Sequence, residues 1–215
     1  MFPQKTIFFL STLFLSSTIF SQNIFWTENF NNGCTSNCPA NSYNGPNGQW
    51  TVSSIGMQGG VSNNWFVSCS ENGNGAGNCG SGCGSDATLH VGENMWPNFD
   101  AGATYNTGGG FNNSTTNKRT ESPVISTIGK TSITLKFEYI ENGDGTNDDG
   151  IAEYSVNGGN TWAQLVNTAK TIVCSGVKGM WTQYTGMLPV ACENISNLKL
   201  GFRWVNNNDA TGNNP

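Results

Sequence analysis

Charged residues are scarce in this sequence. Only 11% of its 215 residues are Asp, Glu, Lys or Arg, and nine basic residues stand against fourteen acidic ones. The net charge is −5 and the pI is about 4.7. Binding to nucleic-acid phosphates requires clustered Lys and Arg, and no stretch of the chain concentrates them. The composition therefore excludes nucleic acid as a partner.

Histidine is nearly absent as well. The one histidine, His90, lies in the alternating stretch "TLHVGEN", and we interpret it as structural. No G-x-S-x-G elbow for a serine nucleophile and no H-E-x-x-H motif of a zinc protease is present. Glu138, Glu141 and Glu153 could supply paired carboxylates for glycoside hydrolysis, but nothing in the sequence places two of them across a cleft. We therefore expect no enzyme.

Helix signals are also lacking, because Gly or Asn interrupts the windows in which apolar residues recur at helical spacing. Strand signals are frequent. Residues 132–140 and 197–205 alternate apolar with polar side chains, which is typical of antiparallel strands that cover a core on one side. The expected inward positions are Ile133, Leu135, Phe137, Tyr139, Leu198, Leu200, Phe202 and Trp204.

Further short strands fill the rest of the chain. Residues 151–166 predict two strands around a turn at Asn157–Asn160, since Asn and Gly tolerate the positive φ of tight hairpins. With 36% hydrophobic residues and seven Trp, the chain can build a core. We predict an all-β antiparallel sandwich of jelly-roll type. The other expected strands are residues 23–30, 49–55, 63–69, 87–92, 103–107, 122–127 and 181–189, with long loops at 71–85 and 106–117.

One long apolar run occurs, at the start of the chain. A lysine precedes the run over residues 7–20, and Ser and Gln follow it, which is the layout of a secretory signal peptide. The run is shorter than the roughly 20 residues of a membrane-spanning helix. We expect residues 1–22 to be removed and residues 23–215 to form a single domain, secreted or on the outer cell surface, with no membrane span. An uncleaved anchor is the alternative.

Cysteine occurs an odd number of times. Two pairs, "CTSNC" and "CGSGC", share a C-x3-C spacing, which in an exported protein favours loop-stapling disulfides. The same spacing occurs in structural zinc sites, so a four-cysteine zinc site is the alternative. Cys174 and Cys192 bracket a hairpin-like stretch and are expected to pair, which leaves Cys69 over. The seven cysteines are Cys34, Cys38, Cys69, Cys79, Cys83, Cys174 and Cys192.

Residues 141–150, "ENGDGTNDDG", combine carboxylates, amides and glycines between two apolar runs. Calcium takes six to eight oxygen ligands of these kinds. The spacing does not fit an EF-hand loop, because the required Gly and the final Glu are missing. A calcium loop of another type and a hydrated turn between strands both remain. The candidate ligands are Asp144, Asp148 and Asp149, with amide oxygens from Asn142 and Asn147.

After Val205 the chain continues only as the polar stretch "NNNDATGNNP". A sandwich that ends in this way leaves a strand position empty, and an unpaired edge is a liability. We therefore expect the chain to be the front piece of a longer protein and the sandwich to lack its final strand. Glu28 on the first strand is a further candidate calcium ligand, which would act together with an acidic residue on that last strand.

Aromatic side chains suggest a second kind of site. Trp96 in "ENMWPNF" and Trp65 in "SNNWFVS" lie near loops, where a flat apolar ring with a polar edge can stack on a sugar. The alternative is core packing, which should account for most of the seven Trp. Trp162 and Trp204 fit core positions especially well.

Three segments resemble a known domain: "CGSGCGSDATLHVG", the strand and loop "KFEYIENGDG", and the hairpin "VNGGNTW". In this order they resemble the N-terminal jelly-roll domain of type IX-secreted, gliding-motility-associated bacterial surface proteins, which is similar to MAM and galactose-binding-like sandwiches. The resemblance covers nearly the whole mature chain. It implies a fold and a surface location, with a closing strand and a sorting domain further on, and it implies no settled activity.

Taken together, these features predict a secreted or cell-surface, non-catalytic β-sandwich module for adhesion or surface interaction. Disulfides would staple it, and Ca²⁺ is the candidate cofactor. Its expected partners are surface glycans or other extracellular proteins. The alternative is a carbohydrate-binding module attached to a larger secreted protein or hydrolase.

Overall fold

The computed structural model describes residues 23–32, 38–39, 43–68, 87–92, 105, 108–109, 113–145, 147–173 and 179–211. Nearly all regular structure in this part is β-strand, and every strand pair is antiparallel. The prediction of an all-β antiparallel fold is confirmed. The elements are β1 (Cys38–Pro39), β2 (Asn44–Gly45), β3 (Gly48–Gln49), β4 (Thr51–Ser54), β5 (Asn64–Ser68), β6 (Thr88–Gly92), β7 (Thr116–Glu121), β8 (Thr134–Tyr139), β9 (Asp149–Ser155), β10 (Ala163–Asn167), β11 (Thr182–Met187), the 3-10 turn η2 (Val190–Cys192) and β12 (Lys199–Asn206).

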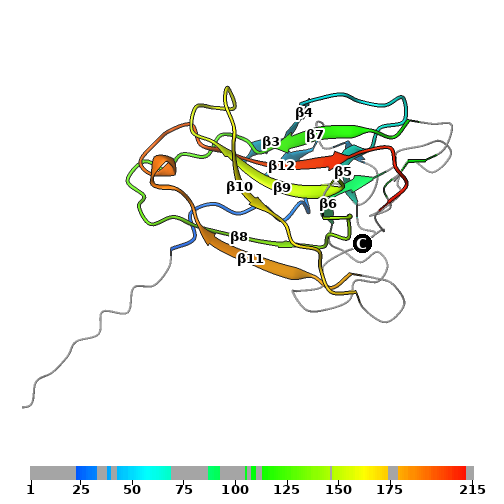
Figure 1. Ribbon diagram of the computed structural model, residues 1–215. Helices are drawn as coiled ribbons and strands as arrows, with labels where there is room; N and C mark the ends of the chain where they lie inside the picture. The colour runs from blue at the N-terminus through cyan, green and yellow to red at the C-terminus, as the bar shows by residue number, and fades with distance from the viewer. Residues whose placement is uncertain are drawn as a thin grey trace, which may run out of the picture.

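The largest sheet has five strands in the order β10-β9-β12-β7-β4 and forms the upper layer in Figure 1. Its central strand, β12, pairs with β9 on one side and β7 on the other. Leu198, Leu200 and Trp204 are buried, with exposed fractions of 1%, 6% and 4%. The alternation of the sequence therefore places the inner face of β12 correctly.

The opposite layer consists of two smaller sheets, β11-β8 and β1-β5-β6. Both pack on the same face of the five-stranded sheet. Phe137 in β8 contacts Phe202 in β12, with ring centroids 5.2 Å apart, and Trp65 in β5 shares a core cluster with Trp204. Figure 1 shows β8 and β11 below the large sheet, with β6 near the right-hand end of β8. The described residues thus form a two-layer sandwich, whereas the jelly-roll connectivity stays a prediction.

The turn between β9 and β10 lies where the sequence predicts it. Gly158 and Gly159 adopt positive φ values of 73° and 99°, which glycine takes without strain. The Asn157 side chain accepts a hydrogen bond from the Thr161 N–H at 2.9 Å. Glycine and asparagine therefore close this hairpin for the reason expected.

Strand β7 is not predicted by the sequence pattern. Its residues read "TNKRTE" and include no hydrophobic side chain, and its first two fall in a stretch interpreted as a loop. Even so, β7 lies inside the large sheet between β12 and β4. Thr116 and Thr120 are fully buried on one face, and Arg119 and Glu121 are 7% exposed on the other. Polar side chains can fill a central strand when each finds a partner.

Two expected strands do not form ladders. Residues 23–30 form no strand ladder with the residues described here, and Phe30 has a positive φ of 57°. Residues 122–127 contribute one isolated bridge, between Ile125 and Leu198. Both segments nevertheless cover the core, because Ile125 and Trp26 belong to or pack against the cluster around Leu198.

Cys192 carries a free, fully buried thiol. The expected disulfide with Cys174 is therefore not formed in this structure; Cys192 instead packs in the core beside Ile125 and Leu198. Burial raises the pKa of its thiol to about 11, so the sulfur stays protonated at neutral pH. Neither C-x3-C disulfides nor the zinc alternative can be placed, because the side chains of the remaining cysteines lie outside the described residues: Cys34, Cys38, Cys69, Cys79, Cys83 and Cys174.

Within the same described ranges, no helix is long and apolar enough to cross a membrane. Residues 1–22, where the signal peptide is predicted, lie outside them.

Candidate functional site

The loop between β8 and β9 closes tightly around Asp144. Its Oδ1 accepts hydrogen bonds from the N–H groups of Asn147 at 2.7 Å and Asp148 at 2.9 Å. The Asp144 N–H in turn donates to the Asp148 carbonyl at 3.1 Å. A side chain at Gly143 would collide with that same carbonyl. The acidic stretch is therefore a compact, defined loop.

Two carboxylates at this loop are buried and form no salt bridge with a described residue. Glu141 is 5% exposed and Asp148 is 0% exposed. Glu141 Oε1 accepts the Gly143 N–H at 2.6 Å, and Asp148 Oδ1 accepts the Asn207 N–H at 3.0 Å. Among the described residues, Glu141 Oε2 and Asp148 Oδ2 have no hydrogen-bond partner, while the Asn206 side chain also hydrogen-bonds the Asp148 carboxylate. Burying a carboxylate oxygen without a partner costs free energy. A bound proton or a cation at each of these two oxygens would lower that cost.

Both carboxylates have strongly perturbed pKa values. Burial raises the pKa of Glu141 to about 7 and that of Asp148 to about 6. Repulsion from Asp144 adds to both increases, while Lys170 opposes the increase at Glu141. Burial and the same Asp144 charge also raise the pKa of Asp149. Negative charge is thus concentrated inside this end of the sandwich.

The segment after β12 packs against this loop. The Asn207 N–H bonds the Asp148 carboxylate, and the Thr211 hydroxyl donates to Asp144 Oδ2 at 3.2 Å. Asp209 follows the same turn, and its hydrogen bonds from Thr211 and Asn207 lower its pKa. Sequence reasoning missed this contribution because the contacts join residues about 60 positions apart. It also missed Glu141 as a buried member of the cluster.

The three predicted calcium ligands, Asp144, Asp148 and Asp149, do lie at one loop, together with Glu141. Within the described ranges, however, no three acidic, His or Cys side chains are placed so that they alone could hold a metal. Calcium takes many of its oxygens from amides, backbone carbonyls and water. A cation here would therefore combine the buried carboxylates with neutral oxygens such as that of Asn142.

The other predicted site residues lie elsewhere. Glu28 accepts hydrogen bonds from the Tyr43 hydroxyl at 3.1 Å and the Trp50 indole at 3.3 Å, so its carboxylate serves the core and not the acidic loop. Trp65 is 9% exposed, and its indole N–H donates to a β7 carbonyl at 3.1 Å. It packs in the core and also lines the cleft described below, and sugar stacking at Trp65 stays a prediction. Trp96 lies outside the described residues.

His90 lies in the core, as the sequence suggests. It is 6% exposed, its Nε2 lies 2.6 Å from the Thr88 hydroxyl, and its ring stacks on Phe66 with centroids 5.8 Å apart. These contacts fix the imidazole of β6 against Phe66 in the paired strand β5 and indicate a structural role.

A cleft of about 1410 Å³ opens between the two layers. β8 borders it on one side, and residues 23–31 and β6 on the other; inner residues of β12 form its floor. Aromatic rings line much of it, among them Trp26, Trp181 and Phe202.

No protein-family model matches the chain. No curated protein or solved structure matches it either. The resemblance to surface proteins of the type IX system stays a prediction, and any function rests on the geometry.

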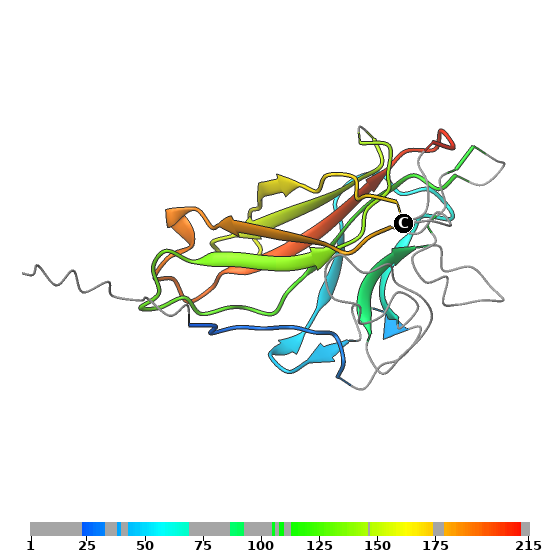
Figure 2. The same ribbon diagram turned by 90° about the horizontal axis from the view of Figure 1, so that it is seen from below.

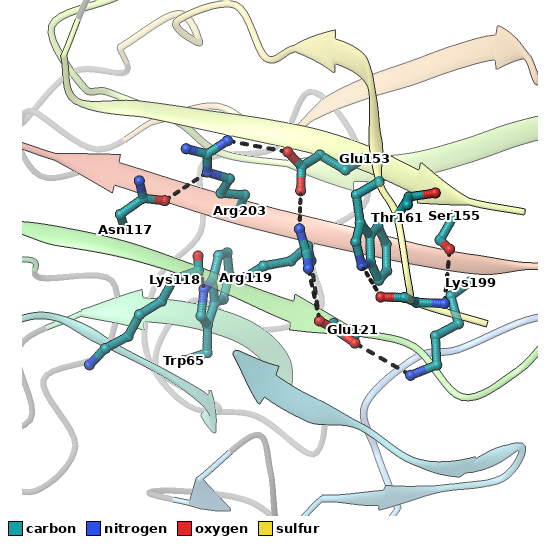
Figure 3. A network of polar contacts seen from close by, with 12 residues as sticks. Trp65, Asn117, Lys118, Arg119, Glu121, Glu153, Ser155, Thr161, Lys199 and Arg203 are labelled. Carbon is teal, nitrogen blue, oxygen red and sulfur yellow. Dashed lines mark hydrogen bonds and ion pairs between the residues drawn. The ribbon is translucent and has the colours of Figure 1, made fainter. Parts of the chain in front are cut away.

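The outer face of the large sheet provides a contrast to the acidic loop, because its buried charges are paired (Figure 3). Arg119 in β7 bonds Glu153 in β9 at 3.0 Å and Glu121 at 3.1 Å. Lys199 reaches Glu121 at 3.3 Å, and Arg203 reaches Glu153 at 3.4 Å. Each carboxylate of this network meets two basic groups, so it needs no added cation.

Trp162 covers this network. Its ring centroid lies 3.9 Å from the Arg119 guanidinium carbon, and its indole N–H donates to the Gly159 carbonyl at 2.9 Å. Gly201 in β12 leaves room for the stack, since an added Cβ would lie 2.7 Å from Arg119 Cδ and 2.8 Å from Trp162 Cζ3. The expectation that Trp162 belongs to the core is therefore wrong: it packs on the opposite face, over charged side chains.

Proposed function

We propose that the chain is a non-catalytic β-sandwich module of an exported protein, stabilised by calcium, which acts in adhesion or surface interaction. The observation that carries the proposal is the pair of unpartnered, buried carboxylate oxygens, Glu141 Oε2 and Asp148 Oδ2. A bound cation would remove the cost of burying both charges and would fix the loop that joins β8, β9 and the segment after β12.

The donor set favours calcium over other metals. The loop offers carboxylate, amide and carbonyl oxygens and contains no His or Cys, so it suits a hard cation better than zinc or copper. Calcium accepts irregular arrangements of six to eight oxygens, whereas magnesium demands a near-ideal octahedron. The loop here is irregular and offers few carboxylates, so it suits calcium better than magnesium.

The test is a calcium titration of chelator-treated protein at pH 7.5, followed by thermal unfolding. A ligand that binds only the folded state stabilises it by about 2.7 kcal/mol at a hundredfold excess over Kd, which is roughly 5–10 °C for a chain of this size. Glu141→Gln and Asp148→Asn should abolish the shift. Glu138→Gln, on the exposed face of β8, is the matched control and should keep it. An unchanged melting temperature of the parent protein at millimolar calcium would refute the proposal.

The second candidate function is carbohydrate binding, and the aromatic lining of the cleft favours it. The indole N–H groups of Trp26 and Trp181 have no partner among the described residues, and both residues line the cleft. Aromatic rings of this kind stack on the apolar faces of sugars. A glycan array with and without chelator would separate the two functions. Binding that Trp181→Ala removes would support the carbohydrate function, and no glycan binding in either condition would leave adhesion to protein partners.

A further inference from the structure

We propose that the cleft beside β8 binds one extended β-strand from another polypeptide, antiparallel to β8. This inference rests on the proposed function, because it names the kind of partner that the module would hold. It is carried by the backbone as well as by the side chains that border the cleft.

The first observation is the edge of β8 that no described strand pairs with. Among the residues that the structure describes, β8 pairs only with β11, and the Leu188 N–H donates to the Ile133 carbonyl at 2.8 Å. Hydrogen-bonded pairs alternate along an antiparallel ladder, so every second residue from Ile133 directs its backbone toward β11. The residues between them direct N–H and C=O toward the cleft, without backbone hydrogen bonds in the described part of the chain. They are Thr134, Lys136 and Glu138.

The second observation is the opposite border. Residues 23–28 are extended and form no backbone–backbone hydrogen bonds with described residues. Phe25 lies beside the segment that precedes β8, where Lys130 Nζ is 5.4 Å from its ring centroid. Figure 2 shows this segment running in the same direction as β8. A strand placed between them and running the other way would be antiparallel to both.

The side chains specify what kind of strand fits. Leu135 and Phe137 point into the sandwich and line the cleft, so the bound strand needs apolar residues at every second position. Lys136 and Glu138 are exposed on the outer face. Opposite charges directly across a ladder are favourable, so the strand should present a basic residue beside Glu138 and then an acidic one beside Lys136. Only another strand can form hydrogen bonds with a series of backbone N–H and C=O groups spaced as they are along β8, so a sugar or a lipid is a poorer fit.

The experiment uses a dye-labelled eight-residue peptide with Val or Ile at alternate positions and the order basic, acidic, neutral at the positions between. Its binding to the purified protein is followed by fluorescence anisotropy. We expect saturable binding of the peptide. A peptide of the same composition with the basic and acidic residues exchanged should bind several-fold more weakly.

Two proline variants test the edge itself. Lys136→Pro removes an N–H that faces the cleft and leaves the β8–β11 hydrogen bonds in place, so it should weaken peptide binding at least tenfold. Thr185→Pro is the matched control: it removes an equivalent N–H from the far edge of β11 and should not change binding. Thermal unfolding of both variants verifies that each is folded.

Equal binding by the two proline variants would overturn the proposal, as would failure of either peptide to bind the folded parent protein. Sedimentation that reveals a dimer abolished by Lys136→Pro would also overturn it, because a second copy would then occupy the cleft. Calcium-dependent melting does not involve this edge. A retained calcium shift without peptide binding would therefore reject the strand site while the proposed function stands.

Discussion

Removal of the Glu153 carboxylate should destabilise the protein by about 3 kcal/mol. Glu153 lies between Arg119 and Arg203, and the side chains of Glu153 and Arg119 are only 7% and 8% exposed. Loss of one partner from a buried ion pair costs roughly 3–5 kcal/mol, because the other charge stays buried. The lower end applies here, since Arg119 keeps Glu121 at 3.1 Å and Arg203 keeps the Asn117 amide oxygen at 2.7 Å.

Urea unfolding monitored by Trp fluorescence measures this change. With a slope of about 1–3 kcal/mol per molar urea, Glu153→Ala should lower the midpoint by roughly 1 M or more. Arg203→Ala is the control, because the Arg203 side chain is 26% exposed and such pairs contribute about 1 kcal/mol or less. The double variant Glu153→Ala with Arg119→Ala should recover part of the loss, since no charge is then left alone. If Glu153→Ala were no more costly than Arg203→Ala, the reasoning about the buried network would be wrong.

The free energy of unfolding in calcium-free buffer should fall as the pH rises from about 4 to about 7. In the folded protein the pKa values of Glu141 and Asp148 are about 7 and 6, above those of the unfolded chain, and each difference changes the free energy of unfolding by up to about 3 kcal/mol over this pH range. Melting curves measured across the range should show a smaller pH dependence for Glu141→Gln than for the parent protein. A parent protein that becomes more stable as the pH rises would contradict the prediction. Gly201→Ala should lower the free energy of unfolding by about 1–3 kcal/mol, because the added methyl group overpacks the site. Urea unfolding measures this change, and an unchanged midpoint would contradict it. Cys192 should not react with thiol reagents in the folded protein, but it should react in urea without added reductant, which the mass of its peptide would show. If it reacted only after reduction, the predicted disulfide between Cys192 and Cys174 would be supported instead.

Strands with one apolar face could be predicted from the sequence, and strands buried by polar contacts could not. The alternation of apolar and polar residues in β8 and β12 predicts both the strands and the side chains that face the core. β7 carries no such pattern, because its burial depends on ion pairs from Arg119 and Glu121 to strands far along the chain. The same limit explains Trp162: when both faces of a sheet are covered, a large aromatic residue can belong to either.

Only those residues of the candidate site that are neighbours in the sequence could be predicted. A run of Asp, Asn and Gly between two strands identifies the loop with Asp144, Asp148 and Asp149. The burial of Glu141 and the approach of Asn207 and Thr211 depend on how distant segments pack. The edge of β8 that no described strand pairs with is likewise a property of the sheet order, which local sequence does not contain.

The burial of charge has a consequence for how the molecule responds to salt. Among the described residues, seven charged side chains are buried: Lys118, Arg119, Glu121, Glu141, Asp148, Asp149 and Glu153. Salt screens buried charge pairs much less than exposed ones. The contribution of the Arg119 network to stability should therefore change little between low and high ionic strength.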